Sequence, residues 1–428
     1  MHVLLVNDGT AGDMHPFFAL GRELQRRGHR VSVLSNEVYR AQGERLGFRY
    51  IVTGSAAEYE ASTANPDMWK SSKARVTAWK EIVVPRLRPS YQLLLRECGD
   101  DAVIVCGLLT AAFARAVQEK HGVPLLTTVL SPQVFLSARD PAVGLPLPRW
   151  LPYPARAALL WGLDKAIDGV MAPDLNAFRA ELGLPPATRI RGRRVYSPQG
   201  TLGLFPEWFG PRAADWPSPL SLTGFPLFDE AQDALDPGLE AFLAAGTPPL
   251  VFTAGTGMRH GHVFFAAAIE LLQRLGRRGV LLAKSSAGQL PQQLPPTVLA
   301  RDYAPLARLL PRSAAFVHHG GIGSAAQALA AGVPQLVVPY AYDQFDNGER
   351  LRKLGCGRVV AQLDQLDLAE TALRELLGDA AVAAACARCR DLMEPGEVAT
   401  ARAADVVEAV AVKRPVTAIA PQPAVAAG

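Results

Sequence analysis

The chain has 428 residues, which is long for one domain and suits two. Hydrophobic residues make up 49% of it and charged residues 20%, a composition typical of a globular protein with a sizeable core. The formal net charge of +4 is small for this length and Lys and Arg form no dense run, so we exclude nucleic acid as the main partner. No apolar stretch reaches the ~18 residues that a transmembrane helix needs.

The cysteines and the first residues both indicate a reducing compartment. Five cysteines are an odd number, as expected for free thiols. The start, MHVLLVNDG, lacks the basic region and the long apolar region of a signal peptide, so we expect a cytoplasmic protein. Cys386 and Cys389 lie in an alanine-rich segment with no second Cys or His pair at ligand spacing, so they read as two thiols on one helix face.

The first half of the chain alternates apolar runs with helical patterns. Phe17, Leu20 and Leu24 keep helical spacing up to Gly28, between two strand-like runs. Such βαβ units imply a parallel sheet. The expected strands are 2–6, 30–35, 101–109 and 124–131, and the expected helices are 15–29 and 110–122. Residues 137–200 are rich in Pro and Arg and are expected to form a loop plus helices, most clearly a helix over 172–186.

A second series of the same kind follows a Pro- and Trp-rich stretch at 205–230. Its expected strands are 280–285 and 334–340, and the segments 249–257 and 314–324 are each expected to be a strand followed by a glycine turn. Its expected helices are 262–279, 325–332, 368–379 and 380–393. We therefore predict an α/β protein of two doubly wound, Rossmann-like domains facing across a ligand cleft. The predicted boundaries are 1–210, a linker at 211–230, a second domain at 231–412 whose last helices can pack back on the first, and a flexible tail at 413–428.

The segment VHHGGIGS suits anion binding. Gly320, Gly321 and Gly323 follow a strand and precede a helix, so the backbone can approach an anion and the helix end offers free N–H groups. Ser324 adds a hydroxyl, and His319 can donate to a phosphate oxygen. It is not a P-loop, because no Gly-Lys-Ser/Thr follows. The alternative is a strand-to-helix turn that needs glycine only for packing.

The polar run DQFDN at 343–347 follows the next strand, near the same cleft. Asp343 and Gln344 together can accept from and donate to vicinal hydroxyls of a sugar. The simpler reading is a helix cap, with Asp346 or Asn347 as the capping residue. Both roles can hold at once.

These motifs, in this order and spacing, resemble the donor signature of nucleotide-sugar glycosyltransferases of the GT-B fold, family 1. The matching parts are His319, 320–324, AGVP at 331–334 and Asp343-Gln344, while residues 9–24 resemble the acceptor-side turn of that family. The resemblance implies a donor site in the C-terminal half and an acceptor site in the N-terminal half. Within the family, the chain looks most like the rhamnosyltransferases of rhamnolipid synthesis. That likeness implies transfer of L-rhamnose from dTDP-L-rhamnose to a hydroxy fatty acid dimer of the 3-hydroxyalkanoyloxyalkanoate type.

The resemblance also implies roles at the donor site. The diphosphate would contact His319, Gly320, Gly321, Gly323, Ser324 and, from the turn at 253–257, Thr256; His318 would line the same pocket or simply end the strand. Tyr303 and Ala304 would meet the nucleotide base, and Asp343 and Gln344 the sugar. Gln327 stands where the family usually has a ribose-binding Glu, and Leu306 where it has a Gln, which fits a deoxyribose nucleotide. No metal and no cofactor beyond the nucleotide-sugar co-substrate are implied.

The predicted catalytic base is Asp13. Inverting transfer needs a group that takes the proton of the acceptor hydroxyl, and burial would raise the pKa of an aspartate enough to help. Its alternative role is to cap the helix that contains Pro16. His15 is the rival base. The orienting Asp used by family members with a catalytic His is not evident, because the strand before Gly107 offers none.

An apolar acceptor would need an aromatic or aliphatic lining, for which Trp69, Phe135 and Trp161 are candidates, although each could equally be a core aromatic. The segment 149–165 mixes Arg with Trp, Tyr and Leu. It could touch a membrane surface or a lipid acceptor, or form a plain surface helix. A lipid acceptor would also imply a partner enzyme that supplies it.

Other functions stay open at this point. The chain could transfer glucose from a UDP or dTDP donor to an apolar natural product or sterol, or bind a sugar nucleotide without catalysis. A sugar-nucleotide epimerase would need several acidic groups, of which only Asp13 is well placed. An oxidoreductase is disfavoured, because NDGTAGD is not GxGxxG and no acidic residue ends the second strand at Ser35.

Overall fold

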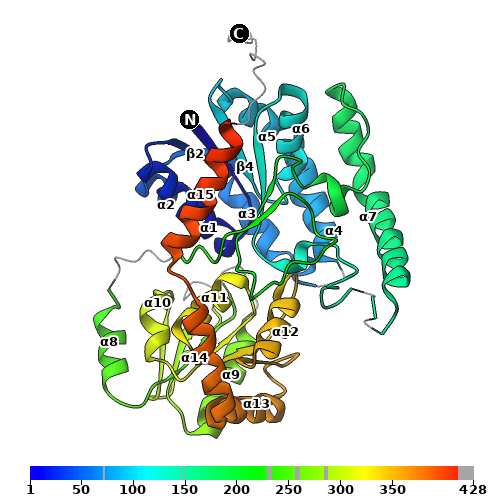
Figure 1. Ribbon diagram of the computed structural model, residues 1–428. Helices are drawn as coiled ribbons and strands as arrows, with labels where there is room; N and C mark the ends of the chain where they lie inside the picture. Colours follow the sequence, from blue (N-terminus) through cyan, green and yellow to red (C-terminus); the bar gives the residue numbers. More distant parts are fainter. Residues whose placement is uncertain are drawn as a thin grey trace.

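The computed structural model describes residues 1–70, 73–145, 147–148, 150–228, 234–255, 261–283 and 288–412. Two α/β units lie one above the other, with the N-terminal unit at the top of Figure 1 and the C-terminal unit below it. Thr256 and the predicted tail, 413–428, lie outside the described residues.

The N-terminal unit is built on a sheet of seven parallel strands in the order β3-β2-β1-β4-β5-β6-β7. Every residue of β1 and β4 is buried, as expected for central parallel strands covered by helices on both faces. The strands are β1 His2–Val6, β2 Arg30–Asn36, β3 Arg49–Gly54, β4 Ala102–Cys106, β5 Leu125–Val129, β6 Thr201–Gly203 and β7 Leu220–Leu222. The helices are α1 Ala11–Arg26, α2 Arg40–Arg45, α3 Ala56–Ala64, α4 Ala74–Ala78, α5 Val84–Glu97, α6 Ala111–His121 and α7 Tyr153–Glu181, with single turns η1 Glu37–Tyr39, η2 Pro66–Trp69, η3 Trp79–Val83, η4 Pro132–Val134 and η5 Ile190–Arg194.

The C-terminal unit repeats this plan with six parallel strands in the order β10-β9-β8-β11-β12-β13. The strands are β8 Leu250–Thr253, β9 Gly279–Leu282, β10 Val298–Arg301, β11 Ala315–His318, β12 Gln335–Val337 and β13 Gly357–Val359. The helices are α8 Pro237–Ala244, α9 His262–Leu275, α10 Leu306–Leu309, α11 Ile322–Ala331, α12 Gln344–Leu354, α13 Leu366–Gly378, α14 Ala380–Leu392 and α15 Gly396–Val412, with one turn, η7 Leu310–Arg312.

The strand order reverses once in each sheet. In the first sheet β1 pairs with both β2 and β4, and in the second β8 pairs with both β9 and β11. The crevice beside the carboxyl ends of such strands is where open α/β sheets bind ligands. The loops after β1, β4, β8 and β11 are therefore the parts of the fold that matter for function.

The predicted fold class is confirmed, and several details differ. The strands β3, β6, β7, β10 and β13 were not predicted, because they are short or half-exposed and carry no continuous apolar run. Helix α7 runs without a break from Tyr153 to Glu181 and continues through Pro173, so it joins the helix predicted over 172–186 to the segment 149–165, for which a surface helix was one of the readings. The stretch predicted as linker, 211–230, contains β7, which pairs with β6 in the first sheet.

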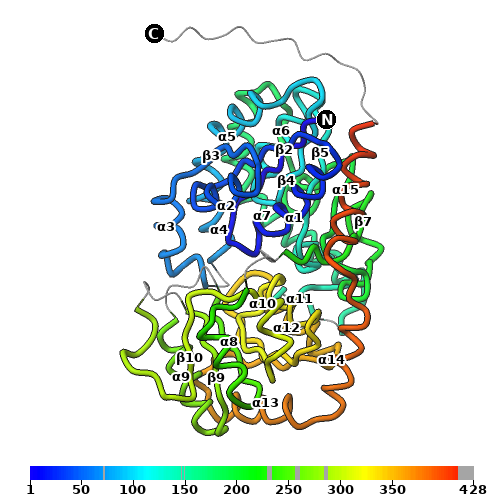
Figure 2. The backbone as a smooth tube through the Cα atoms, turned by 90° about the vertical axis from the view of Figure 1, so that its left-hand side faces the viewer, coloured from blue at the N-terminus to red at the C-terminus, as the bar shows by residue number. Residues whose placement is uncertain are grey.

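Helix α15 returns from the C-terminal unit to the N-terminal one. Figures 1 and 2 both show it beside the N-terminal unit, while α14 stays with the C-terminal unit. Arg27, at the end of α1, donates to Asp405 at 2.7 Å, to Glu408 at 3.0 Å and to the carbonyl of Ala401 at 2.9 Å. The side chain of His29 lies 2.8 Å from Glu408. These contacts tie the end of the chain to its beginning.

A second set of contacts joins α12 to loops of the N-terminal unit. The guanidinium of Arg350 donates to Asp346 on its own helix and to Asp140 of the N-terminal unit, both at 2.7 Å. Asp346 in turn accepts from the backbone N–H of Val143 at 3.1 Å. These groups are largely buried, so the contacts hold the two units in one orientation.

None of the helices within the described residues combines the length and the apolar character that a membrane crossing requires.

Replacing Arg27 by Ala tests whether the contacts of Arg27 with α15 stabilise the packing of α15 against α1. The Arg27 side chain is 19% exposed and makes three interactions with α15, so we expect a loss of about 1–2 kcal/mol in apparent unfolding free energy. Arg26→Ala is the matched control, since Arg26 is 71% exposed and pairs only with Glu23 on its own helix. Thermal unfolding would contradict this stabilising role of Arg27 if both variants melted at the wild-type temperature.

Candidate functional site

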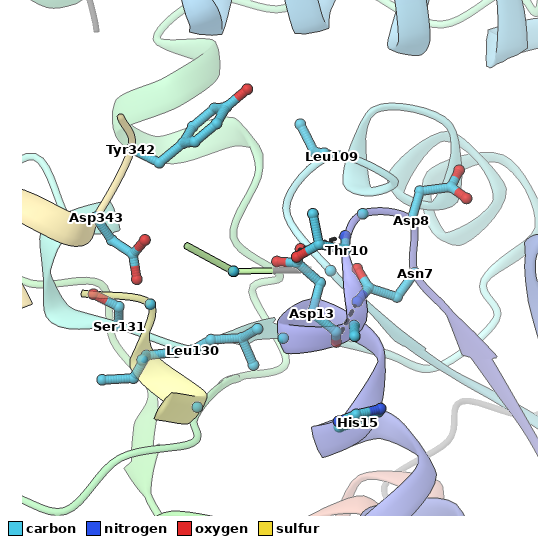
Figure 3. Close-up of a pocket in the computed structure, with 18 of the residues that line it drawn as sticks. Asn7, Asp8, Thr10, Asp13, His15, Leu109, Leu130, Ser131, Tyr342 and Asp343 are labelled. Carbon is cyan, nitrogen blue, oxygen red and sulfur yellow. Dashed lines mark hydrogen bonds between the residues drawn. The ribbon is translucent and has the colours of Figure 1, made fainter. Parts of the chain in front are cut away.

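A large cavity of about 1720 Å³ lies between the two units. Its walls come from the loops after β1 and β4 on one side and after β8 and β11 on the other. It is therefore the crevice that the two strand-order reversals predict. Figure 3 shows part of it, with Asp13 and His15 on α1 and Asp343 on the opposite wall.

Asp13 lies in the first turn of α1, which begins at Ala11, four residues earlier than expected. Thr10 is the N-cap, and both its backbone N–H (2.8 Å) and its hydroxyl (3.0 Å) donate to Oδ2 of Asp13. The predicted capping role is thus present in a different form, with Asp13 at the third helical position. Among the described residues Oδ1 accepts no hydrogen bond. Burial raises the pKa of Asp13, while the two hydrogen bonds from Thr10 oppose the rise.

Asp343 faces Asp13 across the cavity, with both carboxylates directed into the same space in Figure 3. Burial raises the pKa of Asp343 to about 6, a hydrogen bond from Asn347 at 2.8 Å opposes the rise, and the charge of Asp13 adds to it. The preceding residue, Tyr342, has a φ of +57°, a left-handed conformation that is rare for an aromatic residue and that clusters at ligand sites.

The glycine turn after β11 leads directly into α11. Gly320 has a φ of +91°, and a Cβ there would lie 2.7 Å from Val337 and 2.9 Å from the carbonyl of Gln344, so only glycine fits. Gly321 is the N-cap and supplies no side chain. The first N–H groups of α11 are consequently available to a ligand, at the positive end of the helix dipole. A Cβ on Gly323 would meet nothing of the protein within 4 Å.

His319 lines the cavity beside this turn. Its ring fills the space that a Cβ on Gly255 or Gly321 would need, at 2.7 Å and 2.5 Å respectively. Its Nδ1 is buried and has no hydrogen-bond partner within the described part of the chain. Burial lowers the pKa of His319 to about 4, so the ring is neutral at pH 7 and one nitrogen can donate. An orphaned buried ring nitrogen in a cavity is a group that a ligand can satisfy.

His318 does not line the cavity, contrary to its predicted place at the diphosphate. It is fully buried at the end of β11 and stacks on Phe316, with ring centroids 4.6 Å apart. Its Nε2 lies 3.0 Å from the side-chain oxygen of Gln335, and its Nδ1 accepts from the N–H of Gly320 at 3.1 Å. Since both ring nitrogens are used inside the domain, His318 ends the strand and fixes the glycine turn.

The remaining donor-side candidates lie along the same wall. Tyr303, Ala304, Gln327 and Ser324 all line the cavity, and Tyr303 is 56% exposed. Tyr303 and Ala304 come from the loop after β10, whereas Ser324 and Gln327 lie on α11, and the fold brings the two segments together. The turn after β8 is described only up to Gly255, which also lines the cavity.

Gln344 reaches the cavity with part of its amide already committed. Its side-chain oxygen accepts from the N–H groups of Tyr340 at 2.7 Å and Ala341 at 3.0 Å, so only its NH₂ group is left for a ligand. Of the two capacities predicted for Gln344, accepting and donating hydrogen bonds, only donation is left for a ligand. Asn347, considered only as a cap, instead joins Gly320 to Asp343 through its amide nitrogen, at 2.9 and 2.8 Å.

The three aromatic residues predicted for the acceptor side lie in three different environments: the cavity, the core and the surface. Trp69 lines the cavity and donates its indole N–H to the carbonyl of Thr63 at 2.9 Å. Phe135 is 1% exposed and packs against Trp216 in the core of the N-terminal unit, with ring centroids 4.5 Å apart. Trp161 is 60% exposed on α7, away from the main cavity. Of these three aromatic residues, only Trp69 lines the cavity between the two units.

His15 also lines the cavity, one half-turn of α1 beyond Asp13. Its ring packs against Phe228, with ring centroids 5.1 Å apart. Figure 3 shows it apart from the space that Asp13 and Asp343 share. Asp13 is thus the better placed of the two candidate bases.

Several charged groups of the cavity were not predicted from the sequence, among them Asp8, Arg75 and Arg191. Asp8 is buried, and burial raises its pKa to about 6 against the pull of Arg86, whose Nη1 lies 3.3 Å away. Its signal was present, since it comes directly after β1. Arg75 and Arg191 also line the cavity. Arg75 follows residues without a clear periodicity, and Arg191 lies in an arginine-rich loop, so neither stood out.

No group of three or more His, Cys, Asp or Glu side chains within the described residues is arranged to hold a metal ion. The chemistry that the described groups can supply is proton transfer at Asp13 and anion binding at the helix N-terminus and His319.

Comparison with known proteins agrees with this arrangement. Residues 3–138 match the glycosyltransferase family 28 N-terminal domain, and residues 270–409 match the erythromycin biosynthesis protein CIII-like C-terminal domain. The O-mycaminosyltylonolide 6-deoxyallosyltransferase of Streptomyces fradiae is 31% identical over 372 residues, which cover 83% of this chain and 84% of that protein.

Solved structures share the fold over nearly the whole chain. The glycotransferase of kitacinnamycin superposes with a TM-score of 0.73 at 25% identity, covering 96% of this chain and 98% of its own. The spinosyn rhamnosyltransferase SpnG complexed with thymidine diphosphate superposes with a TM-score of 0.65 at 19% identity, covering 95% of this chain and 100% of its own.

Two glycine substitutions test which glycine between β11 and α11 is required for packing. Gly320→Ala introduces a Cβ at positive φ against Val337 and a backbone carbonyl, so we expect it to cost about 1–3 kcal/mol of stability. Gly323→Ala introduces a Cβ that meets no protein atom, and we expect an unfolding temperature within a degree or two of wild type. Equal melting of both variants would contradict this geometry.

Proposed function

Because the chain belongs to the GT-B nucleotide-sugar glycosyltransferases of family 1, we propose that it transfers a sugar with inversion, using Asp13 as the base. The observation that carries the proposal is the cavity between the two units. On one wall Asp13 has a raised pKa and a free oxygen, and on the other an open helix N-terminus lies beside Asp343 and His319. A base and a leaving-group site on opposite walls suit attack from one face of the sugar while the nucleotide leaves from the other.

The donor would lie against the C-terminal unit, in the domain assigned to residues 231–412. Its diphosphate would accept from the first N–H groups of α11, from Ser324 and from the neutral ring of His319. Helix dipole and neutral donors can stabilise the leaving diphosphate without a resident cation. The thymine or uracil base of the nucleotide would contact Tyr303 and Ala304. Gln327 would contact the ribose without a charge, which supports a thymidine rather than a uridine nucleotide.

The acceptor would lie against the N-terminal unit, residues 1–210. Its part of the cavity is mostly aliphatic, with walls that include Val76, Ile82, Leu109, Ile167 and Met171. Aliphatic walls suit alkyl chains, which supports a lipid-like acceptor bearing a hydroxyl. Our specific proposal is transfer of L-rhamnose from dTDP-L-rhamnose to a hydroxy fatty acid dimer.

A second candidate is transfer from a UDP- or dTDP-sugar to an apolar natural product, as the name of the Streptomyces fradiae relative suggests. Association with a membrane face and with an enzyme that supplies the lipid also belong to the proposal. They are supported by the exposed apolar side chains of Trp150, Leu159 and Trp161 at the start of α7.

Asp13→Asn tests catalysis. The amide keeps the size of the side chain but cannot take a proton, so we expect transfer to fall by at least ~100-fold while dTDP binding is unchanged. His15→Gln is the matched control on the same helix, and it should lose less than ~10-fold. The assay supplies dTDP-L-rhamnose and UDP-glucose in parallel, with the hydroxy fatty acid dimer as acceptor. Full activity in Asp13→Asn would refute the proposal that Asp13 is the catalytic base. Transfer from UDP-glucose alone would refute the proposal that dTDP-L-rhamnose is the donor.

The pH profile tests the environment of Asp13. A base must be deprotonated, so kcat/KM should fall as the pH drops through its raised pKa, above the ~4 of an ordinary aspartate. The Thr10 hydroxyl stabilises the charged form, so Thr10→Val should move this limb to higher pH by about half a unit to one unit. A limb that stays in place, or moves to lower pH, would show that another group titrates.

A further inference from the structure

Two arginines enter the acceptor part of the cavity from different elements of the N-terminal unit. Arg75 lies on α4, and Arg191 lies on the η5 turn that packs against α7. Within the described residues neither forms a salt bridge, whereas Arg86, which lines the same cavity, is paired with Asp8 and Glu58. Arg75 is exposed and Arg191 is half-buried, so a ligand in the largely aliphatic cavity can reach two guanidinium groups that have no salt-bridge partner among the described residues.

Arg191 is held in place with donors unused. It hydrogen-bonds to the hydroxyl of Tyr196, which itself donates to the carbonyl of Val134 at 3.1 Å. The neighbouring backbone is fixed too, since the N–H of Gly192 donates to Asp164 on α7 at 3.1 Å. The Nη1 of Arg191 is nevertheless buried without any partner in the described part of the chain. A buried donor on a fixed side chain indicates an acceptor that arrives from outside.

The two guanidinium groups also act on one another. Burial and the charge of Arg191 lower the pKa of Arg75, and the charge of Asp343 opposes this. Arg75 thus lies within electrostatic range both of Arg191 and of the predicted sugar site. An anion bound between the arginines would be close to the place where transfer occurs.

We propose that Arg75 and Arg191 bind the carboxylate of an acidic, amphipathic acceptor, whose alkyl chains pack on the aliphatic wall. This inference rests on the proposed function and narrows its substrate class to hydroxy acids. Planar guanidinium groups bind carboxylates through paired hydrogen bonds, which also fix orientation. In a hydroxy fatty acid dimer the carboxylate and the free hydroxyl lie at the two ends of the polar backbone, from which the alkyl chains branch. Holding the carboxylate at the arginines therefore positions the hydroxyl towards Asp13.

Calorimetric titration with the free acid of a β-hydroxydecanoic acid dimer and with its methyl ester tests the proposal. With dTDP present, the wild-type protein should bind the acid about ten-fold more tightly than the ester. Arg75→Met and Arg191→Met should each weaken binding of the acid about ten-fold and leave the ester unchanged. Arg193→Met is the control, because Arg193 is exposed on the same turn and does not line the cavity.

The possible outcomes separate this inference from the proposed function. Equal binding of acid and ester by wild type, or no binding of either, would overturn the anion site. So would variants that lose dTDP affinity in place of acid affinity, because the arginines would then serve the donor. If the acid preference depends on both arginines but no sugar is transferred, the anion site stands and the proposed transfer fails.

Discussion

The placement of α12 against the N-terminal unit is the constraint on which the rest of the structure depends. Arg350, 8% exposed, bridges Asp346 on its own helix and Asp140 on the opposite unit. One turn earlier, Asn347 accepts from the hydroxyl of Ser131 and donates to the glycine turn and to Asp343. Removing one partner of a buried ion pair leaves an uncompensated charge, so separating the two units at Arg350 is unfavourable. This contact therefore keeps the ligand-binding edges of the two sheets facing one another.

That arrangement also determines the electrostatics of the cavity. Asp13 and Asp343 come from different units, yet burial raises the pKa of each, and the charge of Asp13 adds to the raised pKa of Asp343. Burial likewise keeps the ring of His319 neutral beside the helix N-terminus. The fold therefore places a carboxylate with a raised pKa on one wall of the cavity, and a neutral histidine beside a helix N-terminus on the other.

Much of this could be predicted from sequence, for identifiable reasons. Continuous apolar runs predicted the central strands, and the motif order around His319 and Asp343 indicated the wall of the cavity. Short or half-exposed strands such as β3 and β13 have no such signal. The Pro and Arg content of residues 137–200 obscured the continuity of α7, which was predicted as separate helices. Side-chain fates were harder still, because His318 and His319 are adjacent in sequence yet only His319 reaches the cavity. Phe135 and Trp161 show the same limit, since aromatic character alone does not separate core, surface and site.

A crystal structure of the protein with dTDP would test the central claim most directly. We predict the diphosphate at the N-terminus of α11, within hydrogen-bond distance of His319 and Ser324, with the sugar side of the nucleotide facing Asp13. Density for the diphosphate at the turn after β1, between Gly9 and Gly12, would contradict the account. The donor would then belong to the N-terminal unit, and Asp13 could not act as the base.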